Sequence, residues 1–323
     1  MTSTSLEEQY RAAVRWYPPR WRRRFGEAMV GVLLDVADGE GRTAPATGEL
    51  VDLRGRGLAE WINVVCAQDV RALVASISVG AAAAFTLTYF FFVSWPQGFD
   101  RGTVPENVPL FGPFLNAAPL FIAPVLLMFV AAVAGSRVLT HAIAVVALLG
   151  VVSAALVRSA TGNWNGPGST TVVFVALLVI FASIGDPRRR LPSLAAFGLV
   201  GIASALLGFL RLPTARPWET QFVGDAGWWS IALAPWVLAS AGGIVLVSVL
   251  VLLAQRRTVL AAAIAVAWLP WAAAATVTLK VFAGEEADSF VIAIGSVALC
   301  LFVLQQVRTR TIRRGTGDAP TRA

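Results

Sequence analysis

The chain has 323 residues, of which 57% are hydrophobic and 14% are charged, whereas a soluble globular domain has about 45–50% apolar and about 25% charged residues. This composition excludes an ordinary soluble domain, and the apolar excess occurs in blocks of about 20 residues, the helix length that crosses a bilayer. The net charge of +7 does not indicate a direct nucleic-acid partner, because the basic residues cluster at the ends of the apolar runs, as in membrane proteins.

Residues 1–70 are predicted to form a small cytoplasmic domain of three amphipathic helices. A capping box from Ser5 to Glu8 starts a helix that we expect to end near Trp16. Two consecutive prolines then break the helical pattern. Apolar residues recur at helical spacing in residues 20–38 and again in residues 46–67, which are the predicted second and third helices.

Aromatic and basic side chains are concentrated where the first predicted helix ends and the second begins. The aromatic residues are expected to form either the core of the domain or a docking surface. Arginines in the first turn of a helix oppose its dipole, at a cost of a few tenths of a kcal/mol each. Two compensating contacts stay open: contact with anionic lipid headgroups, at about 1 kcal/mol per basic residue, or contact with acidic residues such as Glu27. The candidate residues for contact with a partner or with lipid are Trp16, Tyr17, Arg20, Trp21, Arg22, Arg23, Arg24 and Phe25.

The same region resembles a known type of helical domain. The resemblance rests on Tyr10-Arg11, Trp16-Tyr17-Pro18-Pro19-Arg20-Trp21-Arg22, Phe25-Gly26-Glu27-Ala28-Met29 and Leu33-Leu34-Asp35. Over about residues 6–62, the chain resembles the N-terminal segment of many actinobacterial membrane proteins, which is related to the HAAS-type signalling domain and to the permease-prefix segments of some ABC-type permeases. Ala28 departs from the pattern, which commonly has an acidic residue there. The resemblance implies a PadR-like transcriptional regulator or an ABC-type ATPase as a partner.

Residues 71–307 are predicted to be a membrane domain of eight transmembrane helices. The fold class is therefore all-α: a polytopic membrane helix bundle preceded by the small cytoplasmic three-helix domain. Residues 308–323 are expected to be a basic, disordered cytoplasmic tail. The eight expected spans are residues 72–95, 114–134, 138–158, 169–185, 191–210, 229–254, 258–279 and 290–307.

The distribution of cations predicts the orientation of these spans. Ten arginines precede or begin the first run, and another eleven lie in alternate connections and in the tail, including Arg137, Arg256 and Arg257. The remaining connections hold five cations. Because positive residues are retained on the inner side of a membrane, both termini are expected to face the cytoplasm, with the chain in the cell membrane.

The sequence contains no constellation that predicts catalysis, a cofactor or a metal site. The predicted spans have no acidic or basic residue near their centres, where ion-coupled transporters usually need one. His141 is the only histidine, and with Cys66 and Cys300 far apart it cannot provide three or four zinc ligands. The glycine-rich residues 162–170 lack the lysine of a phosphate-binding loop. We therefore expect a protein that is not an enzyme.

These patterns lead to two functional hypotheses. The first is a regulatory or docking membrane protein that acts through its N-terminal helical domain, with the lipid bilayer and a soluble protein as its partners. The alternative is a permease-like transport component that lacks its own ATPase.

Overall fold

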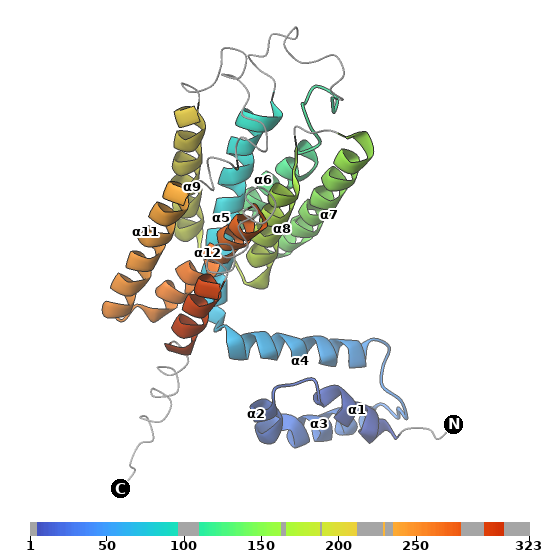
Figure 1. Cartoon of the computed structure of the whole chain (residues 1–323). Helices are drawn as coiled ribbons and strands as arrows, with labels where there is room; N and C mark the ends of the chain where they lie inside the picture. Colours follow the sequence, from blue (N-terminus) through green and yellow to red (C-terminus); the bar gives the residue numbers. More distant parts are fainter. Residues whose placement is uncertain are drawn as a thin grey trace. The chain divides into compact units, whose positions relative to one another are not determined.

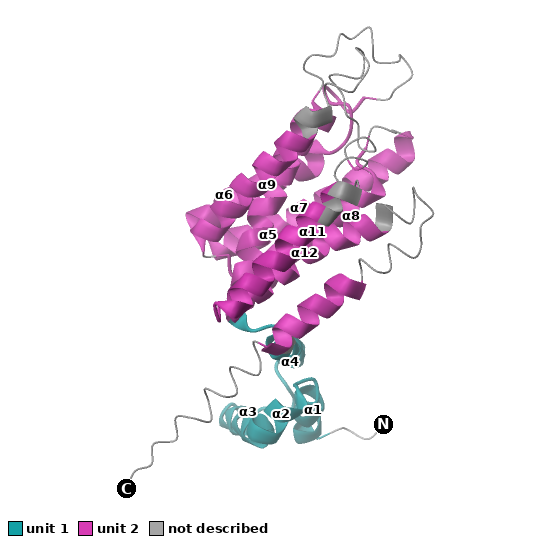
Figure 2. Ribbon diagram, turned by 60° about the vertical axis from the view of Figure 1, so that its left-hand side comes forward, with its two compact units in different colours: residues 1–68 teal, residues 69–323 magenta. Residues whose placement is uncertain are grey.

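The computed structural model describes residues 5–95, 110–162, 166–187, 189–211, 229, 235–278 and 294–306. Within these residues all regular secondary structure is helical, apart from one isolated bridge between Phe111 and Phe114. The predicted all-α class is confirmed. The chain divides into two compact units, Met1–Gln68 and Asp69–Ala323 (Figure 2). The predicted tail 308–323 lies outside the described residues.

The first unit contains α1 (Leu6–Val14), α2 (Pro19–Trp21), a π-helical segment η1 (Arg22–Gly26), α3 (Glu27–Gly39) and α4 (Glu49–Val65) (Figure 1). The capping box is present: the Ser5 hydroxyl accepts from the Glu8 amide at 3.3 Å, and the Glu8 carboxylate accepts from the Ser5 amide at 3.1 Å. The first helix ends two residues before its predicted end. The predicted second helix consists of α2, η1 and α3 in succession.

The small core of the first unit is closed by apolar packing and by one polar cluster. Buried Tyr10, Ala13, Val14, Val30 and Leu53 pack together from α1, α3 and α4. The Tyr10 hydroxyl donates to the Glu49 carboxylate at 3.0 Å, and the Ala46 amide donates to the same carboxylate at 2.9 Å. Arg42 adds a third bond to Glu49 at 3.1 Å. The Tyr10–Glu49 bond therefore connects the start of α4 to α1.

The second unit is a bundle of apolar helices. Four of its helices are long and apolar enough to cross a membrane: Gln68–Ser94, Arg137–Thr161, Arg190–Leu207 and Thr258–Thr276. Four further apolar helices are shorter: Pro119–Ala134, Ser169–Ile184, Ser240–Ala254 and Ile294–Gln306. Each predicted span thus has a helix, and within the part of the chain that the structure describes in full four helices meet the length for crossing a membrane, so the count of eight stays a prediction. The labelled elements are α5 (Gln68–Tyr89), η2 (Phe90–Ser94), α6 (Pro119–Ala134), α7 (Arg137–Thr161), α8 (Ser169–Ile184), α9 (Arg190–Arg211), α11 (Pro235–Ala254) and α12 (Thr258–Thr278).

The α6 helix begins five residues later than the predicted span because a buried polar side chain holds the backbone just before the helix in a turn. The Asn116 side-chain oxygen accepts from the Ala118 amide at 3.0 Å and from the Ser94 hydroxyl at 3.1 Å. The Asn116 side-chain amide donates to the Val93 carbonyl at 3.3 Å. These bonds join the end of η2 to the start of α6, and Pro119 then occupies the first helical turn, where it is tolerated.

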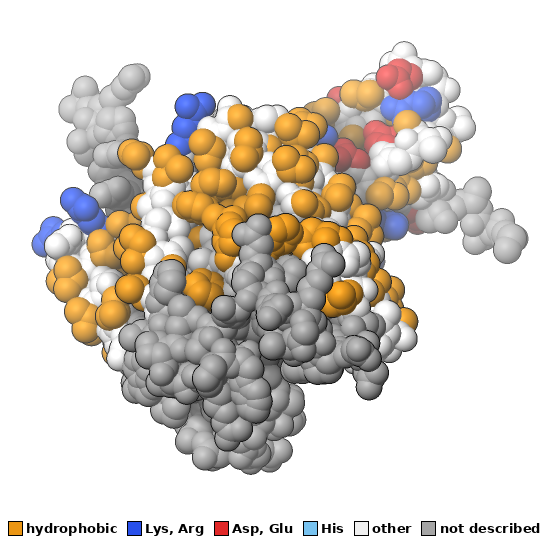
Figure 3. Space-filling model, turned by 90° about the horizontal axis from the view of Figure 1, so that it is seen from above, with side chains coloured by type: hydrophobic (Ala, Val, Ile, Leu, Met, Phe, Trp, Pro, Cys, Tyr) orange, Lys and Arg blue, Asp and Glu red, His pale blue; other side chains and the backbone are white. Residues whose placement is uncertain are grey.

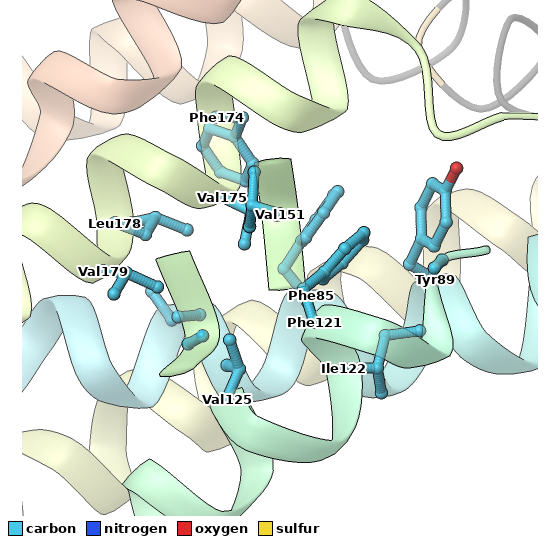
Figure 4. Packing of buried hydrophobic residues seen from close by; sticks show 14 of the residues in the cluster. Phe85, Tyr89, Phe121, Ile122, Val125, Val151, Phe174, Val175, Leu178 and Val179 are labelled. Carbon is cyan, nitrogen blue, oxygen red and sulfur yellow. The ribbon is translucent and has the colours of Figure 1, made fainter. Parts of the chain in front are cut away.

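The α5 helix lies in the interior of the bundle. In its most apolar window 78% of the residues are buried, against 28% in α7 and 11% in α9. Its Phe85 and Tyr89 point into a cluster with Phe121 of α6 and Phe174 of α8 (Figure 4). The edge of the Phe85 ring meets Phe174 with ring centroids 4.8 Å apart. Aromatic packing therefore fills the middle of the bundle.

Large apolar side chains also cover the outside of the bundle (Figure 3). They recur along α7 at Leu149 and Leu156, and along α9 at Leu199 and Ile202, all more than half exposed. Apolar surface costs about 25 cal/mol per Å² in water, so contiguous faces of this kind require an apolar environment. The apolar helices indicate that the chain is associated with a membrane.

Candidate functional site: the aromatic and basic surface of the N-terminal unit

The candidate contact residues follow the end of α1 and continue through α2 and η1. Trp16 lies just after α1, and its carbonyl accepts a hydrogen bond from the Trp61 indole of α4 at 2.9 Å. Gly57 permits this close approach, because a Cβ at Gly57 would lie 3.0 Å from both the Trp16 carbonyl carbon and the Tyr17 ring. Both indoles stay accessible, with Trp16 48% and Trp61 43% exposed.

Three aromatic rings at four-residue spacing form a continuous row. Tyr17 and Trp21 are stacked with centroids 4.1 Å apart, and Trp21 and Phe25 follow at 5.5 Å. Tyr17 is 2% exposed and therefore belongs to the core of the unit, whereas Phe25 at the other end of the row is exposed. Burial raises the pKa of the Tyr17 hydroxyl, which has no hydrogen-bond partner. The row thus runs from the core of the unit to its surface.

The π-helical segment carries the arginine run. Arg20, Arg23 and Arg24 are exposed, and Arg22 is half-buried with its Nε atom unpartnered. Arg24 places its guanidinium carbon 5.1 Å from the centre of the Phe25 ring, within the range of a cation–π contact. A π-segment often marks a functional position in a helix, and the regular helical pattern of the sequence did not predict it.

Acidic neighbours do not neutralise this arginine run. Glu27, expected as a partner for the run, instead accepts from Arg11 at 3.2 Å. None of the ion pairs found within residues 5–68 involves the four arginines between positions 20 and 24. The sequence accounts for this isolation, because no acidic residue occurs between Glu8 and Glu27.

Charge is consequently separated within a unit that is neutral overall. Residues 1–68 contain nine arginines and nine acidic residues, and six of those arginines fall between positions 9 and 26. The acidic residues lie before and after this segment, from Glu7 to Glu8 and from Glu27 onward. Guanidinium groups bind carboxylates and phosphates through paired hydrogen bonds, and exposed indole rings favour protein interfaces and lipid headgroup regions. The exposed residues Trp16, Phe25, Trp61, Arg20, Arg23 and Arg24, grouped here as the aromatic-basic surface, are therefore suited to an acidic partner.

Two other polar residues singled out in the sequence, His141 and Cys300, lie within hydrogen-bond distance of backbone carbonyls. The His141 ring nitrogen Nδ1 lies 2.9 Å from the Arg137 carbonyl of the same helix. Cys300 donates to the Ala265 carbonyl at 3.1 Å across two helices. Across the described residues, no group of three His, Cys, Asp or Glu side chains lies close enough together to hold a metal ion.

Comparisons of the chain with protein-family models, curated proteins and solved structures found no match. The resemblance of residues 6–62 to a HAAS-type or permease-prefix segment therefore stays a prediction. The aromatic-basic surface is identified from this chain's own residues alone.

Trp61 is the residue of this surface that sequence reasoning missed. Its position in the helical pattern assigned it to the core-facing stripe of residues 46–67, but its ring is partly exposed and its indole nitrogen is bonded to the end of α1. A sequence signal was Gly57 one turn earlier, because a glycine inside a helical pattern often has a packing reason.

Proposed function

We propose that this chain is a polytopic membrane protein whose N-terminal unit docks a soluble protein at the cytoplasmic face of the membrane. One observation carries the proposal: exposed Trp16 and Phe25 and three exposed arginines outside the ion pairs of this unit fall within residues 16–25, and the Arg24 guanidinium lies 5.1 Å from the centre of the Phe25 ring. Tryptophan and arginine are the residues that most often dominate the binding energy of protein interfaces. Arginines without acidic neighbours leave their hydrogen-bond donors available to carboxylates of a partner.

The proposed topology has eight spans with both chain ends in the cytoplasm. Four long helices and four shorter apolar helices support the count of eight spans. The tight turn at Gly135 also makes α6 and α7 antiparallel neighbours, as expected of consecutive spans. The bias of arginines towards alternate connections supports the orientation. Only two residues separate α4 from α5 in the sequence.

The partner is proposed to present an acidic surface with apolar sites for the Trp16 and Phe25 rings. A PadR-like regulator or an ABC-type ATPase would fit the resemblance of residues 6–62. The chain itself is proposed not to be an enzyme. The permease-like alternative stays a prediction, and the centre of the described bundle, filled by Phe85, Phe174 and Trp271, offers no observation in its favour.

Site-specific photo-crosslinking of the full chain in living cells tests the docking proposal. A photoreactive residue at position 16 or 25 should give an adduct with one protein, whereas the same residue at Val36, exposed on α3 of the same unit, should not. The double variant Arg23→Gln/Arg24→Gln should reduce the adduct by at least tenfold. The matched control Arg54→Gln/Arg257→Gln removes the same charge elsewhere and should leave the adduct unchanged.

The pattern of adducts separates docking from contact with lipid and from random collision. Lipid adducts alone at positions 16 and 25 would assign the surface to the bilayer and contradict docking. Equal protein adducts at all three positions would show non-specific collisions and would also contradict the proposal.

A further inference from the structure

A cavity of about 570 Å³ opens between the end of α7 and the beginning of α8. Its lining combines apolar side chains and one glycine with one arginine and two hydroxyl groups: Ala155, Pro167, Val172, Val173, Gly162, Arg158, Ser159 and Ser169. Its volume lies within the range of about 300–1,000 Å³ that is typical of small-molecule sites. The cavity lies entirely within the second unit and is separate from the aromatic-basic surface.

Arg158 lies near the end of α7. It follows Arg137, at the other end of the helix, by 21 residues, which corresponds to about 32 Å at about 1.5 Å per residue. The hydrocarbon core of a bilayer is about 30 Å thick. If α7 spans the membrane, its two arginines therefore lie at the headgroup layers of opposite leaflets.

The Arg158 guanidinium uses only some of its N–H donors in the hydrogen bonds of the described residues. It is half-buried, and its Nη1 atom donates to the Pro167 carbonyl at 3.0 Å. This bond fixes the side chain beside the cavity and uses one of five N–H groups. Among the ion pairs of the described residues, none includes Arg158. A cation in this position is uncommon, because arginines are concentrated on the opposite side of the predicted topology.

The apolar part of the lining on α7 adjoins exposed apolar side chains of that helix. Ala155 and Val172 line the cavity, and Leu156 and Val152 beside them on α7 are more than half exposed. A ligand that fills this site must therefore carry an anionic group at headgroup depth and an apolar part below it. A phospholipid has this arrangement, whereas a free anion would leave the apolar lining empty.

We propose that this cavity binds the phosphate headgroup of an anionic membrane lipid. The Arg158 guanidinium pairs with the phosphate oxygens, and the Ser159 and Ser169 hydroxyls donate to the headgroup. One acyl chain lies against Val172 and Val173. The site shares with the proposed function only the premise that α7 spans the bilayer, and it is independent of docking by the N-terminal unit.

Native mass spectrometry of the detergent-purified full chain tests this proposal. Phosphatidylglycerol should remain bound to the wild-type protein, and phosphatidylcholine should be retained at least tenfold less. Arg158→Gln should lower phosphatidylglycerol occupancy about tenfold, whereas the control Arg257→Gln, which removes an exposed arginine at the other end of the bundle, should have no effect. Val173→Trp, which fills the cavity and leaves Arg158 in place, should exclude the lipid as well.

Three outcomes would overturn the inference. Millimolar inorganic phosphate that displaces phosphatidylglycerol from the wild-type chain would identify a free-anion site. Equal losses in Arg158→Gln and Arg257→Gln would show a general effect of net charge. If Arg158→Gln does not fold, as judged by thermal unfolding, Val173→Trp decides alone, and unchanged lipid binding in that variant refutes the site.

Discussion

Replacing Gly80 with alanine tests the packing of the second unit at a close approach of two helix backbones. A Cβ at Gly80 of α5 would lie 2.1 Å from the Ser193 carbonyl oxygen and 3.0 Å from the Phe197 amide nitrogen, both in the backbone of α9. Ordinary contact needs about 3.5 Å, so the two helix backbones would have to separate by roughly 1–1.5 Å. Flexible side chains cannot absorb this change, because the obstructing atoms are backbone atoms.

The expected loss of stability follows from two opposing contributions. Overpacking of a well-packed core costs about 1–3 kcal/mol, and the better helix propensity of alanine returns up to about 1 kcal/mol. A net loss of about 1–2 kcal/mol corresponds to a decrease of about 2–8 °C in Tm for a unit of this size. The matched control is Gly198→Ala on α9, where an added Cβ meets nothing within 4 Å, and its Tm should rise by about 2–4 °C.

Thermal unfolding of the full chain in one detergent, followed by tryptophan fluorescence, measures both variants. The opposite signs of the two shifts are the informative result, because both substitutions make the same chemical change in a helix. If Gly80→Ala raised the Tm as much as Gly198→Ala, the close contact between α5 and α9 would be wrong.

Three further substitutions test individual hydrogen bonds. Partial burial raises the pKa of Glu49, but hydrogen bonds from the Ala46 amide, Tyr10 and Arg42 together lower this pKa below its usual value. The Glu49 carboxylate therefore contributes its full stabilisation above the unfolded-state pKa of about 4.3. This stabilisation is lost as the pH falls through the folded-state pKa. Glu49→Gln should destabilise the first unit at pH 7 by about 1–3 kcal/mol and flatten its acid dependence in urea titrations, and an unchanged acid dependence would contradict this role. Thr171→Val removes the buried hydroxyl that accepts from the Trp229 indole at 2.7 Å, and this should cost about 1–3 kcal/mol of stability. The decrease in Tm is compared with that of Thr88→Val, which removes a hydroxyl bonded within its own helix. Equal decreases would refute the stabilising role of the Trp229–Thr171 bond. Trp61→Phe should cost about 0.5–1.5 kcal/mol and increase proteolysis after Trp16, and unaltered protection would show that this bond does not hold the end of α1.

The helical class and the approximate helix positions could be predicted from the sequence because both depend on local signals. The first predicted span, residues 72–95, corresponds to a helix over Gln68–Ser94, since a run of about twenty predominantly apolar residues already specifies it. The late start of α6 could not be predicted in this way, because it depends on Asn116 bonding to Ser94 and Val93, 22 and 23 residues earlier in the chain.

The candidate site was predicted in composition but not in arrangement. The concentration of aromatic residues and the run of arginines without acidic residues are visible in the sequence. Two features needed the structure: the π-helical segment that carries the arginines, and the hydrogen bond from Trp61 to the end of α1. The Trp61 bond is a contact between α4 and the end of α1, and hydrophobic periodicity carries no information about such contacts.

Labelling of single cysteines with a membrane-impermeant maleimide tests the central claim most directly, which is that α7 crosses the bilayer with the N-terminal unit inside the cell. In chains whose own cysteines are replaced by serine, Val36→Cys should react in inside-out vesicles but not in intact cells. Ser159→Cys, at the far end of α7, should react in intact cells only. Labelling of both positions from the same side would contradict the account.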